Sequence, residues 1–168
     1  MFKTIAEFEQ DWGHESSETQ KMMNALTDAS LSQSVAKDHR TLGRMAWHIT
    51  TTYAEMMSQT GMKFTSVDPE APVPKTAAEI QKAYAAVTKE LGDNLKRHWA
   101  DASLETEDTM YGAYKWKRSF TLSVLIRHEI HHRGQMTVLM RQAGLKVPGV
   151  YGPSMEEWAG RGMNPPTV

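Results

Sequence analysis

Apolar residues recur at three- and four-residue intervals along four stretches of the chain, which is the periodicity of amphipathic helices. The stretches cover approximately residues 5–29, 41–60, 76–99 and 119–143. In the second, one face of the expected helix carries a continuous apolar stripe made of Leu42, Met45, Ile49, Tyr53 and Met56. The pattern therefore predicts four helices, each with one face available for packing against the others.

Capping signals support two of the predicted helix starts. Thr4 and Glu7 have the spacing of a capping box, and Thr76 and Glu79 repeat it before the third helix. Polar residues around Gly13 weaken the first helix, because glycine and serine disfavour a helix interior. We therefore expect a kink or an interruption at that point.

The segments between the helices carry weak strand signals. Residues 31–40 are polar and predict a connection, and residues 62–75 contain three prolines and predict an extended loop. Residues 101–117 predict a packed loop or a short hairpin, and residues 154–158 a short C-terminal helix. With no internal repeat and no second domain boundary, we expect one all-α domain over residues 1–168, a four-helix bundle with irregular loops.

Composition excludes several classes of function. A net charge of −1, from 19 basic and 20 acidic residues, gives no electrostatic basis for general binding to nucleic acid or to a membrane surface. The chain has no cysteine, so a metal site must use histidine, carboxylates and water. No apolar run approaches the roughly 20 residues that span a bilayer, and the N-terminus is too polar for a signal peptide. We expect a soluble, cytoplasmic protein.

A histidine cluster in the fourth helix is the main candidate for chemistry. His128 and His132 are one turn apart, with Cβ atoms about 6 Å from each other. Apolar neighbours within the same 60° sector, such as Leu125 and Leu139, place the pair in the middle of the apolar face. Two neutral imidazoles so placed can bind one metal ion at about 2.0–2.1 Å. His48, on the flank of the second helix, is the candidate third ligand.

The same residues also permit two other interpretations. His128, Glu129 and His132 match the H-E-x-x-H signature of zinc peptidases, with Glu129 as the base and Glu156 or Glu157 as the third ligand. No strand is predicted that could pair with a peptide substrate, which weighs against it. A bundle without catalytic activity, in which the metal is structural, is the other alternative.

Two sequence blocks make the chain resemble the DinB/YfiT-like family over nearly its whole length. They are the run from Leu42 to His48 and the block His128-x-x-x-His132-Arg-Gly-Gln. The segments 139–144 and 151–154 are similar to the family as well. The resemblance implies an up-down-down-up four-helix bundle, often a homodimer, and a divalent metal, zinc or nickel, held by three histidines. Matched by position, these ligands are His48, His128 and His132.

The resemblance also implies a range of activities. Family members with known reactions include thiol-dependent transferases and isomerases that use low-molecular-weight thiols such as bacillithiol, mycothiol or glutathione, and many members have no established reaction. A site with three protein ligands keeps an open position, where a metal lowers the pKa of a bound water or thiol. We therefore expect a small-molecule S-transferase, isomerase or hydrolase, with Glu55 and Glu129 as candidate bases unless they are solvated surface carboxylates.

Overall fold

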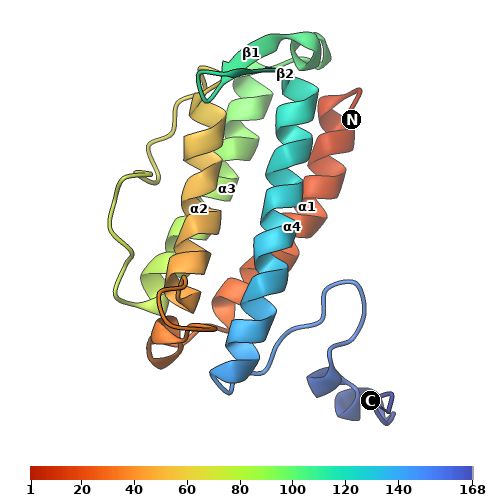
Figure 1. The fold of residues 1–168 in the computed structure, drawn as a ribbon. Helices are drawn as coiled ribbons and strands as arrows, with labels where there is room; N and C mark the ends of the chain where they lie inside the picture. Colours follow the sequence, from red (N-terminus) through yellow and green to blue (C-terminus); the bar gives the residue numbers. More distant parts are fainter. Residues whose placement is uncertain (168) are drawn as a thin grey trace.

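Four long α-helices form the body of the computed structural model, which describes residues 1–167. Each helix packs against two others: α4 lies against α1 and α2, and α3 lies on the opposite side of the same pair (Figure 1). α2 and α3 run in the same direction, and α1 and α4 run in the opposite one. The predicted all-α four-helix bundle is therefore confirmed, with helices α1 (Ile5–Asn24), α2 (Leu42–Ser58), α3 (Ala77–His98) and α4 (Arg118–Gln142).

The parallel pair of helices depends on the long proline-containing loop between α2 and α3. This loop returns along the length of the bundle, so that α3 begins at the end where α2 begins (Figure 1). Side chains of the helices hold it in place: Trp47 Nε1 donates to the carbonyl of Ala71 at 3.1 Å, and Asn94 Nδ2 to that of Lys63 at 2.8 Å. The connection is extended, as its prolines predicted, and it is fixed to the bundle.

α1 differs from its prediction in two ways. It is continuous through Gly13, and it ends at Asn24 instead of residue 29, followed by a 3-10 helix over Asp28–Ser32. Gly13 is exposed with open space around it, so it costs only about 1 kcal/mol of helix propensity. Glu15, two residues after Gly13, is buried on the inner face of the helix with Trp12 and Met22.

A β-hairpin covers the end of the bundle where α4 begins (Figure 1). Strands β1 (Glu107–Met110) and β2 (Tyr114–Lys117) are antiparallel, and the turn between them contains Tyr111 and Gly112 at positive φ. The hairpin predicted for residues 101–117 is thus present. At the C-terminus, two 3-10 turns over Met155–Glu157 and Ala159–Arg161 replace the predicted short helix. Among residues 1–167, no helix is both long and apolar enough to cross a bilayer.

The buried stripe of α4 is not the one that its apolar residues predicted. Glu129 and Arg133 are 1% and 2% exposed and lie between the buried Leu125 and Met136. His128 and His132 are half-buried and lie on the flank of this stripe, so their predicted place in the middle of the apolar face was wrong. α4 turns this face toward the core because the side chains of Glu129 and Arg133 both have buried polar partners, which removes the usual cost of burying charged groups.

Candidate metal site

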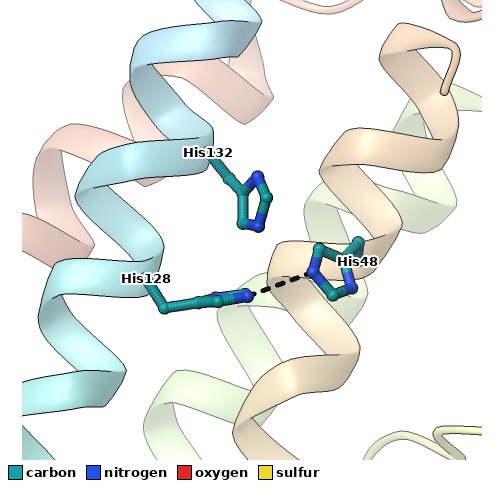
Figure 2. Close-up of side chains that lie close together, drawn as sticks. All are labelled: His48, His128 and His132. Carbon is teal, nitrogen blue, oxygen red and sulfur yellow. Dashed lines mark hydrogen bonds between the residues drawn. The ribbon is translucent and has the colours of Figure 1, made fainter. Parts of the chain in front are cut away.

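Three histidines meet on the flank of the bundle between α2 and α4 (Figure 2). His48 comes from α2, and His128 and His132 come from successive turns of α4, with all three rings directed toward one another. One ring nitrogen of each lies within 4.8 Å of the others, and the Nε2 atoms of His48 and His128 are 3.1 Å apart. The structure thus brings together the three residues that the sequence predicted as metal ligands.

The spacing and chemistry of these nitrogens suit a divalent transition metal. Two ligands placed tetrahedrally at 2.0–2.1 Å from zinc are roughly 3.3 Å apart, close to the 3.1 Å between His48 and His128. Imidazole is a ligand that zinc, nickel, copper and iron accept readily, whereas magnesium and calcium prefer oxygen. The group contains no carboxylate among the described residues. The three histidines therefore fit a zinc- or nickel-like ion.

The surroundings keep these imidazoles in the neutral form that binds metal. Burial, followed by the charge of Arg40, lowers the pKa of His48 to about 3. Burial and the neighbouring His132 lower the pKa of His128 to about 4, and burial also lowers the pKa of His132. An ordinary histidine has a pKa of about 6.5. Because a protonated imidazole cannot coordinate, the site is ready to bind metal at neutral pH without releasing protons from the histidines to solvent first.

Gln135 determines which nitrogen of His132 is available. Its Oε1 accepts a hydrogen bond from Nδ1 of His132 at 2.7 Å, and its Nε2 donates to His131 Nε2 at 3.1 Å. With the proton on Nδ1, the Nε2 atom of His132 keeps its lone pair for a ligand. Histidines that bind metals usually donate their second ring nitrogen to such a partner. Gln135 therefore supports the site as a residue that orients a ligand.

Glu129 lies in the core and is not part of the histidine group. Its carboxylate accepts hydrogen bonds from the hydroxyls of Tyr53, at 2.5 Å, and Tyr84. Trp12 Nε1 in turn donates to the Tyr53 hydroxyl at 2.9 Å. Burial raises the pKa of Glu129. Through these hydrogen bonds the Glu129 carboxylate links α1, α2, α3 and α4 in the interior. The H-E-x-x-H motif would instead require Glu129 to lie at the metal and act as a base.

The other carboxylates considered from the sequence also have partners away from the histidines. Glu55 accepts a hydrogen bond from the hydroxyl of Tyr111 in the hairpin turn, at 3.3 Å, and burial raises its pKa. Glu156 pairs with Arg141 at 3.2 Å. Glu157 accepts from the backbone N–H of Gly149 at 2.9 Å. None of them belongs to the metal-binding group of the described residues.

A pocket of about 370 Å³ opens beside the histidines, and His132 and Gln135 form part of its wall. Apolar side chains make up most of the remainder, while His39 and Arg40 contribute the charged and polar part. Sequence reasoning missed these two residues because it treated residues 31–40 as a simple connection. The one feature of the sequence that could have pointed to them is that two basic side chains stand immediately before Thr41, the N-cap of α2.

Comparison with known proteins agrees with this fold. The model of the DinB family matches residues 1–166. The chain belongs to the DinB family. It is 42% identical to the uncharacterized protein YrdA of Bacillus subtilis over 168 residues, the full length of both. A crystal structure of a DinB-like protein from Bacillus cereus has 47% identity and a TM-score of 0.86, over 90% of this chain and all of that one. The family resemblance noted from the sequence is confirmed.

Proposed function

We propose that this DinB-family protein binds one divalent ion through His48, His128 and His132 and uses it to transform a small molecule. The convergence of three neutral imidazole nitrogens within 4.8 Å is the observation that carries the proposal. Structural zinc sites usually fill four positions with protein ligands, whereas catalytic sites have three. The group of three histidines, half-buried beside a pocket, has the second form.

A divalent ion with an open position would lower the pKa of a bound water or thiol and polarise a substrate oxygen. The protein has no cysteine, so a reaction through a thiol requires a low-molecular-weight thiol as cosubstrate. Gln135 would hold His132 in its coordinating tautomer, and the apolar wall of the pocket would exclude water from the substrate. We propose thiol-dependent transfer or isomerisation, with metal-dependent hydrolysis as the related chemistry of the same site, and zinc or nickel as the metal.

Metal content measured by elemental mass spectrometry tests this proposal. Untagged protein, purified without a metal column and reconstituted with zinc or nickel, should hold about one ion per chain. His48→Ala and His132→Ala should each lose it. His98→Ala is the matched control, since His98 is an exposed histidine at the end of α3 and outside the group, and should keep it. Full stoichiometry in both ligand variants would contradict the assignment.

Activity would then be measured with small thiols and electrophiles, with the metal-free protein as the reference. Loss of thiol from solution should depend on both the ion and His132. If turnover is unchanged after the ion has been removed, the proposed role of the metal is wrong even where the ion binds.

A further inference from the structure

The pocket beside the histidines has two chemically distinct parts. Its apolar wall consists of Met45 from α2, Val138 and Leu139 from α4, and Val35 from the loop before α2. Val35 and Val138 are 56% and 51% exposed, so their apolar surface is open to a ligand. Its polar part is formed by His39 and Arg40 from the loop before α2 and by His132 and Gln135 from α4. A molecule in this pocket would thus contact both apolar surface and the candidate metal site.

The loop that supplies His39 and Arg40 is closed at its base. Ser34 and Thr41 form an antiparallel bridge, and the backbone N–H of Leu42 donates to the carbonyl of Gln33 at 2.7 Å. Within the loop, His39 Nδ1 donates to the carbonyl of Lys37 at 2.9 Å. Arg40 is therefore held next to the N-terminus of α2 by a defined loop and is not part of a free linker.

The polar part of the pocket is positively charged. Arg40 forms no ion pair with any acidic residue of the described chain, and no carboxylate lines the pocket. Arg40 lines the same pocket as His132, so its charge lies beside the candidate metal site. A guanidinium without an ion-pair partner, in a pocket that is otherwise largely apolar, is suited to bind a carboxylate or a similar planar anion.

We infer that this pocket binds a small organic anion, with its anionic group on Arg40, its apolar part on Val35, Met45, Val138 and Leu139, and its reactive group toward the histidines. The inference rests on the proposed function for the role of the bound molecule. A volume of about 370 Å³ is near the lower end of ligand pockets, which range over roughly 300–1,000 Å³. The ligand class is therefore a short apolar carboxylate, not a peptide or a lipid chain.

Binding of hexanoate, followed by amide chemical shifts of the 19.0 kDa protein, tests the inference in both the metal-free and zinc-loaded forms. Hexanoate should bind saturably and shift amides of residues 35–40 and 135–139. The uncharged analogue hexan-1-ol should bind about tenfold more weakly, since it lacks the charge-assisted hydrogen bonds. Higher salt should weaken the binding of hexanoate but not that of hexan-1-ol, because the guanidinium of Arg40 is exposed.

Variants separate the contributions of charge and apolar surface. Arg40→Ala should lower the affinity for hexanoate about tenfold, leave the affinity for hexan-1-ol unchanged and keep the full metal content. Arg44→Ala removes the same charge from an exposed position outside the pocket and should bind hexanoate normally. Val138→Asp, at an exposed position that tolerates a polar residue, should abolish binding by repulsion.

The outcomes distinguish this inference from the proposed function. Equal hexanoate affinity in wild type and Arg40→Ala, or shifts confined to other regions, would overturn the pocket assignment whether or not metal binds. If the protein fails to bind metal but hexanoate binding depends on Arg40, the pocket stands and the proposed function fails. Binding to the zinc form alone, insensitive to Arg40, would show a carboxylate held by the metal and would also overturn the inference.

Discussion

Gln135 is the side chain that prepares His132 for coordination, because it accepts the Nδ1 proton at 2.7 Å and leaves Nε2 free. Loss of such a partner typically lowers metal affinity 10- to 100-fold. We expect Gln135→Ala to weaken zinc binding about tenfold, measured by competition with a chromophoric chelator. Gln135→Glu, which keeps the acceptor, should stay close to wild type. Equal affinity in all three proteins would show that His132 does not depend on this hydrogen bond.

Glu129 is expected to act in stability and not in chemistry. Glu129→Ala leaves the hydroxyls of Tyr53 and Tyr84 without their acceptor in the core, and each such loss costs about 1–3 kcal/mol. The free energy of unfolding in urea should fall by roughly 2–6 kcal/mol in total. Glu129→Gln, which retains an acceptor, should lose less and keep the full metal content. Loss of metal from folded Glu129→Gln would place this residue at the ion after all.

The residues of the site differ in how far sequence alone could identify them. The pair His128 and His132 was predictable because helical spacing places positions i and i+4 together, and His48 because it flanks a packed stripe. The burial of Glu129 was not predictable, since charged side chains are expected on the surface. A usable signal existed in Tyr53 and Tyr84, whose hydroxyls lie on apolar stripes and need a buried partner.

At the scale of elements, Arg133 connects α4 to α1 and to the C-terminal tail. Its guanidinium pairs with the Glu15 carboxylate at 2.5 Å and donates to the Tyr151 hydroxyl at 3.0 Å. The same hydroxyl donates to Glu15 Oε1 at 2.7 Å. Glu15 and Arg133 are both buried, and each provides the opposite charge that the other needs in the core. This network explains how α4 can turn the charged Arg133 toward the core.

Breaking this network on one side only should be costly. Arg133→Ala leaves the Glu15 carboxylate buried without its cation, which is expected to lower the free energy of unfolding by about 3–5 kcal/mol. Arg133→Met combined with Glu15→Gln should be clearly more stable than the sum of the two single changes predicts. Urea unfolding of the wild type, the two single variants and the double variant measures the coupling free energy between Arg133 and Glu15. Strict additivity would mean that the ion pair contributes nothing.

Helix starts were predicted better than helix interiors. The capping boxes at Thr4 and Thr76 are both present, because they depend only on residues close in sequence. The burial of Glu15 on the inner face of α1 was missed, since it depends on the pairing of Glu15 with Arg133 from a distant part of the chain. The orientation of α4 was missed for the same reason. Local signals fix where elements begin, and long-range partners decide which face is buried.

For the whole molecule, histidine titration should make the metal-free protein less stable in mild acid. His48 and His128 have folded pKa values of about 3 and about 4, whereas in the unfolded chain they titrate near 6.5. Below pH 6.5 the unfolded state therefore binds more protons, and the free energy of unfolding falls as pH decreases. Denaturation between pH 7 and 5 should show this slope, and His48→Ala should show a smaller one. Identical slopes would contradict the lowered pKa of His48.

The architecture followed from the sequence more fully than the surroundings of the site. Four apolar stripes and a proline-containing connection predicted the bundle, because burial of such stripes determines how helices pack. The position of Arg40 could not be derived, since it depends on how residues 34–41 close on themselves and line a pocket together with α4. The homodimer and the cytoplasmic location stay predictions.

X-ray absorption at the metal edge of the zinc- or nickel-loaded protein tests the central claim most directly, because it counts the imidazoles around the ion. The account predicts three histidine nitrogens at about 2.0–2.1 Å for zinc, falling to two in His132→Ala if any ion is retained. A first shell with fewer than three imidazoles in the wild-type protein, or one dominated by carboxylate oxygen, would contradict binding through His48, His128 and His132.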